Sequence, residues 1–226
     1  MNELMQAVSQ AETIAIGGHV RPDGDCIGSC MGLYSYIQDN FPGKKVTVYV
    51  EEIPSAFDYL SKEEAMTEQC GADQVYDLFV ALDCGDKERL GEAAGILEKA
   101  KATYCVDHHI TNTHFCQKEQ VEADASSTSQ ILYTLMEDEK ISYATACCLY
   151  TGIIHDTGVF KHSNTSCRTM EIAGALMNKG IPFGKIIDGS FYMKSYKQLQ
   201  IMGRCLMESI RMMDGRCIFS VVKKNI

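Results

Sequence analysis

Short apolar runs alternate with longer periodic segments through the first half of the chain. Four of the runs have the length and composition of strands, at residues 13–18, 45–50, 78–83 and 102–106. The third run, LFVALD, is almost continuously apolar, as expected for a strand whose two faces are both buried in a parallel sheet. Helical periodicity fills the intervals at residues 28–40 and 87–100. This alternation predicts right-handed βαβ units and an α/β fold with a doubly wound, mainly parallel sheet.

From about residue 126 the pattern becomes helical. Four segments have helical periodicity, at residues 126–137, 143–154, 168–179 and 195–213, and a last apolar run at 216–222 has the pattern of a strand. We therefore expect a sheet-containing part over about residues 1–125 and a helical part over about residues 126–213. Residues 214–226, which begin with Asp214-Gly215, are expected to form a linker and the first strand of a further domain.

Composition narrows the class of protein. The 226 residues are 46% hydrophobic and contain no stretch of eighteen apolar residues, which predicts a large buried core and no membrane span. The N-terminal segment MNELMQAVSQAET carries two acidic side chains and no basic one, unlike a secretory signal. The 11 cysteines form no CxxC pair, so we expect small buried side chains in a protein of the reducing cytoplasm.

The formal charge of the chain is −9, from 21 Lys and Arg residues against 30 Asp and Glu residues. An acidic protein lacks the broad basic face that long double-stranded nucleic acid requires. A small phosphate ester stays compatible with this charge, because metal ions held by acidic residues present positive charge locally.

Acidic and histidine side chains cluster where three of the predicted strands end. His19, Asp23 and Asp25 follow the first strand, Asp83 closes the third, and the triplet DHH at 107–109 follows the fourth. Ligands of open α/β sheets bind in the crevice beyond the carboxyl ends of the strands. These side chains are therefore predicted to converge on one crevice.

The residue types in this cluster suit divalent metals. Asp23 and Asp25 are two positions apart, so in extended backbone their carboxylates would share one side, and Gly24 would allow a turn closed to other residues. Carboxylates combined with imidazole favour Mn²⁺ or similar ions over Ca²⁺. The alternative is that the two aspartates only cap the following helix. Asp83 could likewise be a simple turn residue, or a carboxylate that bridges two ions.

The triplet and a later helix end add further candidates. His108 and His109 are adjacent and cannot both face one metal easily, so one is expected to ligate while the other has a different task. Asp156, in the segment GIIHDTG, is on its own merely a polar residue at a helix end. The residue pattern alone leaves its role open.

These motifs occur together and in order in a known family. With GHVRPDGD, LDCGD, DHH and GIIHDTG, the chain resembles the DHH phosphoesterase superfamily over roughly residues 1–220. The continuations RPDGDCIGS, DKERLG and HDTGVFKHSNTS are most similar to the bifunctional oligoribonuclease and pAp phosphatase branch, the NrnA type. The resemblance implies a DHH catalytic domain at residues 1–213.

The resemblance also implies a role for each residue of the cluster. One metal would be held by His19, Asp23 and Asp83, and the other by Asp25, Asp83, His108 and Asp156. The two ions are expected to be Mn²⁺, with Mg²⁺ or Co²⁺ as substitutes. His109 would face the substrate phosphate, and Asp107 would orient the histidines through hydrogen bonds.

Residues after the fourth motif are weaker candidates. Lys161 and His162 could contact phosphate or ribose, or could form a solvated turn. Phe160 could stack on a base, or be buried as an ordinary core aromatic. His155 is expected to have no catalytic task.

The activity implied by the resemblance is hydrolysis of short oligoribonucleotides and/or pAp by a water that two metal ions activate. Two alternatives stay open: hydrolysis of pyrophosphate, polyphosphate or a cyclic dinucleotide, and an inactive metal-binding fragment. The GGGH-like motif of the branch's C-terminal (DHHA1-like) domain does not occur in these residues. We therefore expect that domain to be absent and activity on oligoribonucleotides to be weak. A homodimer is a separate expectation.

Overall fold

The computed structural model describes residues 2–60, 66–67 and 74–222. The chain divides into two compact units, Met1–Phe191 and Tyr192–Ile226, and each is described by itself. This division falls earlier in the chain than the boundary expected between residues 213 and 214.

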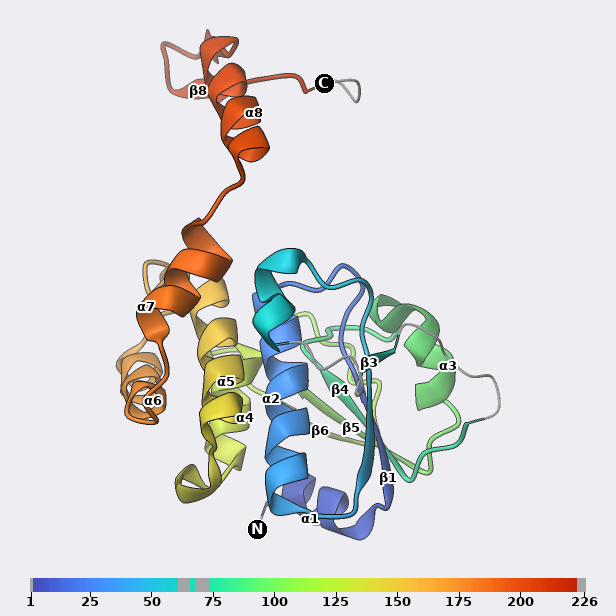
Figure 1. The fold of residues 1–226 in the computed structure, drawn as a ribbon. Coiled ribbons are helices and arrows are strands. Elements are labelled where there is room, and N and C mark those ends of the chain that lie inside the picture. The colour runs from blue at the N-terminus through green and yellow to red at the C-terminus, as the bar shows by residue number, and fades with distance from the viewer. Residues whose placement is uncertain (1, 61–65, 68–73, 223–226) are drawn as a thin grey trace. The chain divides into compact units, whose positions relative to one another are not determined.

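A parallel sheet forms the centre of the first unit (Figure 1). Within the described residues, its strands lie in the order β3-β2-β1-β4-β5-β6, and every pairing is parallel. The strands are β1 (Thr13–Gly17), β2 (Lys45–Tyr49), β3 (Met66–Thr67), β4 (Leu78–Leu82), β5 (Ala102–Asp107) and β6 (Lys118–Val121). Gly17 pairs with Tyr49 on one side and with Ala81 on the other, so these three strands end at nearly the same level.

Alternation along the strands sorts their side chains into two cores. In β4, Leu78, Val80 and Leu82 belong to the larger core, whereas Phe79 and Ala81 belong to the smaller one, as the two-residue period of a strand requires. The helices that share the larger core include α1 (Glu3–Gln10), α2 (Gly24–Asn40), α4 (Thr128–Leu135) and α5 (Tyr143–Asp156). The short α3 (Ala94–Leu97) covers the smaller core on the other face (Figure 1). Helices therefore cover both faces of the sheet, and the predicted doubly wound α/β fold is confirmed.

Serine side chains cap the N-termini of three helices that pack against the larger core. Ser127 caps α4, Ser142 caps α5 and Ser166 caps α6 (Cys167–Met177), and each Oγ accepts a backbone N–H from the first turn. The other helical turns of this unit are short: 3₁₀ turns at Ser55–Leu60, Glu88–Ala93 and Asp138–Lys140, α7 (Phe183–Ile186), and a π-helical turn at Ile187–Tyr192. Across the described ranges, no helix is long and apolar enough to cross a membrane.

Glycine contacts allow α2 and α5 to approach each other closely. A Cβ atom on Gly28 would lie 2.6 Å from the carbonyl oxygen of Cys148 and 2.8 Å from the backbone nitrogen of Gly152. In a close-packed interior these backbone atoms have no room to give way, so a side chain at Gly28 would push the two helices apart. The contact brings the N-terminal part of α2, which carries Asp25, close to α5, which ends at Asp156.

Several local expectations about the first unit differ from the structure. The helix expected at residues 87–100 is a 3₁₀ turn followed by α3, because Gly91 has a φ of 55° and interrupts the helical path. The helix expected from Gly28 begins at Gly24. The sequence analysis missed α1 and β6; β6 has the polar sequence KEQV and is only half-buried, so it lacks the apolar run by which strands were recognised.

The second unit contains one helix and one hairpin within its described residues. The helix α8 (Tyr196–Met207) begins with a capping box formed by Ser195 and Gln198. The strands β7 (Ile210–Met212) and β8 (Cys217–Phe219) then pair antiparallel. The helix expected over residues 195–213 is therefore wrong in its last part, which is a strand.

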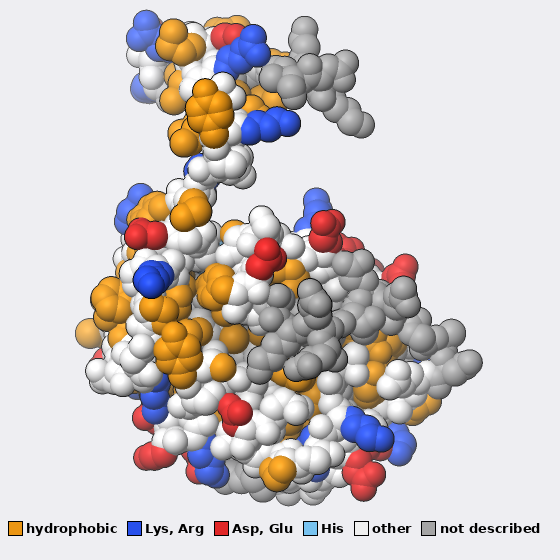
Figure 2. Space-filling model, in the orientation of Figure 1, with side chains coloured by type: hydrophobic (Ala, Val, Ile, Leu, Met, Phe, Trp, Pro, Cys, Tyr) orange, Lys and Arg blue, Asp and Glu red, His pale blue; other side chains and the backbone are white. Residues whose placement is uncertain are grey.

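The turn of this hairpin contains the segment that was expected to be a linker. Asp214 and Gly215 both have positive φ, a conformation typical of a tight hairpin connection. No described residue of the second unit is buried. Figure 2 shows hydrophobic side chains mixed with basic ones on the drawn face of this unit. Leu199, Leu206 and Met207 are among its exposed hydrophobic residues. Its local structure is therefore set by capping and turn signals within the described residues.

Candidate metal centre

Three strands deliver candidate ligands to one place at the carboxyl edge of the sheet. The chain reaches His19 after β1, Asp83 directly after β4 and His108 directly after β5. Nε2 of His19 lies 3.5 Å from Oδ2 of Asp83, and Nε2 of His108 lies 3.5 Å from Oδ1 of the same carboxylate. Asp83 has a φ of 55°, a left-handed conformation that ends the strand at this residue. The structure thus brings the predicted side chains together around Asp83.

The His19 group consists of His19, Asp23 and Asp83, whose ligand atoms all lie within 4.8 Å of one another. Nδ1 of His19 donates to the carbonyl oxygen of Val20 at 2.9 Å, which leaves Nε2 directed at the two carboxylates. Burial by itself lowers the pKa of His19, but hydrogen bonds to Asp23 and Asp83 raise it well above the ordinary value. A place that stabilises a protonated imidazole so strongly also suits a metal cation.

Asp23 caps a helix and also lies in a group of candidate ligands, two positions that the sequence analysis treated as alternatives. Its Oδ1 caps α2 by accepting the backbone N–H groups of Asp25 and Cys26, each at 3.1 Å, while its Oδ2 lies 3.7 Å from His19 Nε2. Asp25 already lies in the first helical turn, so the extended backbone expected for both aspartates is wrong. As a result, the two carboxylates belong to different groups of candidate ligands.

Gly24 is needed for space rather than for backbone freedom. It lies in the first turn of α2 and does not have a positive φ. A Cβ atom at this position would lie 2.2 Å from Cγ of His155. His155 is held in place by Ser190 Oγ, 3.0 Å from its Nε2, and by an edge contact with Phe57 at 4.9 Å between ring centroids. The turn expected at Gly24 is therefore wrong, and the half-buried ring of His155 occupies the space beside this glycine.

The His108 group consists of Asp25, His108 and Asp156, and its ligand atoms also lie within 4.8 Å of one another. Nε2 of His108 lies 3.0 Å from Oδ2 of Asp156. Burial lowers the pKa of His108, but hydrogen bonds to Asp156 and Asp83 raise it to about 11. Burial raises the pKa of Asp25, and repulsion from Asp83 and Asp156 raises it further. Carboxylates crowded in this way are stabilised by a cation between them, so the donor set fits a divalent metal.

The N-terminus of α4 holds both of the fully buried carboxylates of the centre. The backbone N–H groups of Thr128 and Ser129 donate to Asp25 at 2.6 and 3.0 Å. The hydroxyl of Thr128 donates to Oδ1 of Asp83 at 3.2 Å. These contacts and the positive end of the helix dipole fix the two carboxylates in place. The sequence analysis missed this role, although the polar run Ser126-Ser127-Thr128 at a helix start was its visible signal.

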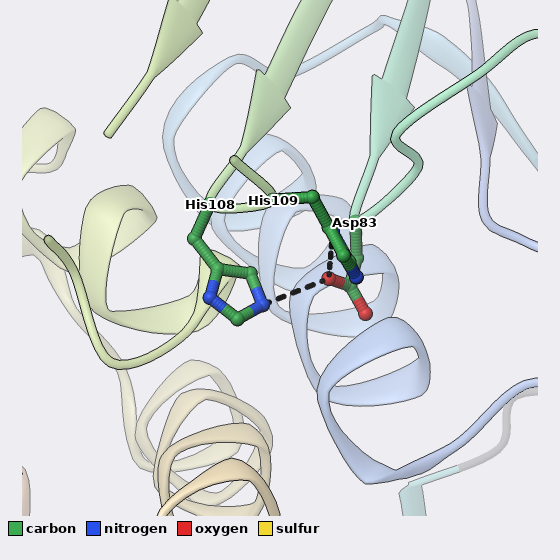
Figure 3. Close-up of side chains that lie close together, drawn as sticks. All are labelled: Asp83, His108 and His109. Atoms are coloured by element: carbon green, nitrogen blue, oxygen red, sulfur yellow. Dashed lines mark ion pairs between the residues drawn. The ribbon is translucent and has the colours of Figure 1, made fainter. Parts of the chain in front are cut away.

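His109 lies beside Asp83 but is tied to a different residue. Figure 3 shows that one oxygen of Asp83 faces a ring nitrogen of His108 and a ring nitrogen of His109, and the two ring centroids are 4.8 Å apart. Nδ1 of His109 lies 2.7 Å from Oδ1 of Asp107 and 3.8 Å from Oδ1 of Asp83. The hydrogen bond to Asp107 raises the pKa of His109, against the effect of burial. Asp83, His108 and His109 form a third group with metal-ligand spacing, but the shorter bond engages Nδ1 of His109 with Asp107.

The residues after α5 lie at the rim of this centre. Lys161 and His162 are both exposed, and Nδ1 of His162 is 3.2 Å from the carbonyl oxygen of Asp156, to which it donates. Phe160 is half-buried and makes an edge contact with Tyr150 at 6.2 Å between ring centroids. The aromatic ring is thus engaged with the core, while the two basic residues stay accessible.

Sequence comparisons relate the chain to known hydrolases. The DHH family, N-terminal domain, matches residues 13–153. The bifunctional oligoribonuclease and PAP phosphatase NrnA of Mycoplasma pneumoniae is 32% identical over 195 residues, which cover 82% of this chain and 59% of that protein. A probable enzyme of the same name from Streptococcus mutans is 30% identical over 185 residues, covering 81% and 58%. The cyclic-di-AMP phosphodiesterase GdpP of Bacillus subtilis is 27% identical over 199 residues, covering 78% and 29%.

Two solved structures are also similar to the chain. An exopolyphosphatase-related protein from Bacteroides fragilis superposes with a TM-score of 0.85 at 26% identity, over 93% of this chain and 65% of that one. A putative family II inorganic pyrophosphatase from Methanococcus jannaschii has a TM-score of 0.58 at 18% identity, over 78% of this chain and 60% of that one, and shows a shared fold.

The chain spans less than two-thirds of the length of these curated relatives. The matched family segment covers most of the sheet and every strand end that carries a candidate ligand. The chain belongs to the DHH family.

Proposed function

We propose that the chain hydrolyses phosphoesters of short oligoribonucleotides and/or pAp with two divalent metal ions. His19, Asp23 and Asp83 would hold one ion, and Asp25, Asp83, His108 and Asp156 would hold the other. The observation that carries the proposal is the position of Asp83, whose two carboxylate oxygens face His19 and His108 respectively. A carboxylate placed in this way can serve two groups of ligands at once. The names of the 30–32% identical relatives support the choice of substrate.

Bound divalent ions would supply positive charge for the phosphate and lower the pKa of a water molecule. The side chains of the chain have separate tasks around them. Asp107 holds Nδ1 of His109, so the other ring nitrogen is available to donate to a phosphate oxygen or to the departing oxygen. Lys161 and His162 are exposed at the rim and are proposed to add weak contacts to phosphate or ribose.

Several finer points are part of the same proposal. Mn²⁺ is the proposed ion, because mixed carboxylate and imidazole ligands suit it, with Mg²⁺ or Co²⁺ as substitutes. We propose action in the cytoplasm, in line with the free thiols of the described cysteines. Homodimer formation stays a prediction.

A substrate panel tests the proposal. The chain is incubated with Mn²⁺ and a dinucleotide, pAp, cyclic di-AMP, pyrophosphate or bis(p-nitrophenyl) phosphate, with Asp83→Ala as the matched control. We expect turnover of the dinucleotide or pAp that a chelator abolishes and Asp83→Ala lacks. Preference for cyclic di-AMP would favour the second candidate, which the 27% identity to GdpP motivates. Metal binding without turnover of any substrate would show a binding module instead.

The same panel tests how well these residues hold a nucleotide. Binding energy from the non-reacting parts of a substrate helps to position the reacting phosphate, and poor positioning can cost about a hundredfold in rate. We expect the small aryl diester to be hydrolysed faster than the dinucleotide, because it depends only on the metal centre. Efficient dinucleotide cleavage would contradict this and would show that the DHH domain has its own nucleotide pocket.

A further inference from the structure

Asn112 contacts both the backbone and a buried carboxylate next to the centre. The residue is 9% exposed, and it follows the DHH triplet in the loop before β6. Nδ2 of Asn112 donates to Oδ2 of Asp107 at 2.6 Å and to the carbonyl oxygen of Cys84 at 3.4 Å. Among the described residues, the hydrogen bond to Oδ2 of Asp107 comes from the side chain of Asn112.

The orientation of the Asn112 amide follows from its other contact. Oδ1 accepts the backbone N–H of His114 at 2.8 Å. A backbone N–H can only donate, so the amide oxygen must face His114, and the amide nitrogen must face Asp107. The backbone N–H of Asn112 also donates to the carbonyl oxygen of His109 at 3.1 Å, which closes a turn over residues 109–112. Hydrogen bonds from both the backbone and the side chain of Asn112 therefore hold the loop in place.

Asp107 is held from both sides by these contacts. Its Oδ1 is bonded to Nδ1 of His109 at 2.7 Å, and its Oδ2 is bonded to Asn112. The Asp107 side chain is fully buried, so an oxygen that lost its donor would have no water to replace it. The position of the His109 ring thus depends on a chain of two hydrogen bonds that begins at Asn112.

We propose that Asn112 is a positioning residue, whose amide orients Asp107 and, through it, the ring of His109 toward the substrate phosphate. The inference rests on the proposed function, since it assigns the task of His109 to phosphate hydrolysis. Asn112 has no place in the His19 or His108 groups and would leave metal binding unchanged. It acts on turnover through geometry.

Two substitutions test the side-chain contacts of Asn112, and one of them removes the donor alone. Asn112→Leu removes both polar atoms at nearly the same volume. Asn112→Asp keeps an oxygen that accepts from His114 but replaces the donor to Asp107 with a second acceptor. We expect both variants to lose kcat by about 10–100-fold, the range typical of residues that orient catalytic or ligating groups, with KM and Mn²⁺ affinity within about threefold of the wild type. Asn40→Leu is the matched control, because Asn40 donates to backbone carbonyls of Tyr36 and Lys140 away from the site.

The decisive experiment is a double-mutant cycle with His109→Ala, combined with proton NMR of the metal-free protein. In the His109→Ala background, Asn112→Leu should change kcat by less than about twofold, because the ring that it positions is gone. In the wild type, the Nδ1–H proton of His109 should give a downfield, slowly exchanging signal, which is lost in both His109→Ala and Asn112→Leu.

Four results would overturn the inference. These are wild-type kcat in Asn112→Asp, a fall in Mn²⁺ affinity parallel to kcat, additive losses in the double mutant, and an unchanged Nδ1–H signal in Asn112→Leu. If the wild type hydrolyses no phosphoester, the proposed function fails. The NMR signal then still decides whether Asn112 holds the Asp107–His109 pair.

Discussion

The two groups of candidate ligands are built in different ways. In the His19 group, His19 and Asp23 come from one short segment after β1, and the side chain of Asp23 is 60% exposed. The His108 group instead draws on α2, β5 and α5, and its Asp25 is completely buried beneath the N-terminus of α4. The first group thus takes two of its three members from one short segment, whereas the three members of the second come from separate elements that helix packing brings together. Substitutions at Gly152 in α5, which lies against Asp25 and Ser129, should therefore damage the His108 group more than the His19 group.

The largest effect is expected where the two groups meet. Asp83→Ala removes a carboxylate of the His19 group that also lies 3.5 Å from His108 and is proposed to contact both ions. We expect Mn²⁺ affinity to fall by more than about a hundredfold, beyond the usual loss for residues that only orient ligands. His109→Ala should keep the metal and lower kcat by roughly 10²–10⁴-fold. Metal titration and kinetics of both variants provide the measurement. Equal loss of metal in the two would show that His109 is a ligand, as the third group of Asp83, His108 and His109 would allow.

A packing variant should separate the two groups. In Gly152→Ala, the new Cβ would lie 2.0 Å from Ser129 Oγ and 2.4 Å from Asp25 Oδ1. We expect a loss of about 1–3 kcal/mol in the free energy of unfolding, together with weaker binding at the His108 group. Gly174→Ala in α6 is the control, because no atom lies within 4 Å of the new Cβ, and it should stabilise the protein by roughly 0.5–1 kcal/mol. Loss of both metal sites in Gly152→Ala would contradict the separation.

Thr128 offers a finer test of how α4 supports the centre. Thr128→Val keeps the side-chain shape and the backbone N–H that donates to Asp25, but removes the hydroxyl that donates to Asp83. We expect Mn²⁺ affinity to fall about 10-fold, at the low end of the range for residues that orient ligands. Thr128→Ser should retain wild-type affinity, since it keeps the hydroxyl. If Val and Ser behaved alike in calorimetric titrations, the hydroxyl would have no role.

The smallest effect is expected at the rim. Lys161 and His162 are exposed, and contacts between exposed charges are worth about 0.2–1 kcal/mol. The double substitution Lys161→Ala and His162→Ala should therefore raise KM for a nucleotide substrate by at most about fivefold, while kcat and metal binding stay unchanged. Steady-state kinetics at two salt concentrations measure this. A large fall in kcat would move these residues into the catalytic centre.

The same contrast explains what could be predicted from the sequence. The doubly wound sheet and the convergence of His19, Asp83 and His108 follow from apolar runs that end in polar residues. Asp156 could not be found in this way, because its position depends on how α5 packs against α2, and the resemblance to a family supplied it. The support from Thr128 and Asn112 was missed because hydrogen bonds between distant segments leave no periodic pattern.

Two local predictions were wrong, one in each unit. Helical periodicity was extended through residues 210–212, although Asp214-Gly215 is a strong hairpin signal. A turn was predicted at Gly24, whereas the glycine is needed there because a side chain would overlap His155. The second error arose because the identity of a glycine does not reveal whether its backbone conformation or its surroundings require it.

Anomalous diffraction from crystals grown with Mn²⁺ tests the two-metal centre most directly. We predict two manganese peaks, one among His19, Asp23 and Asp83 and the other among Asp25, His108 and Asp156, with Asp83 contacting both. One peak alone, or a peak coordinated by His109, would contradict the shared-carboxylate centre on which the proposed hydrolysis depends.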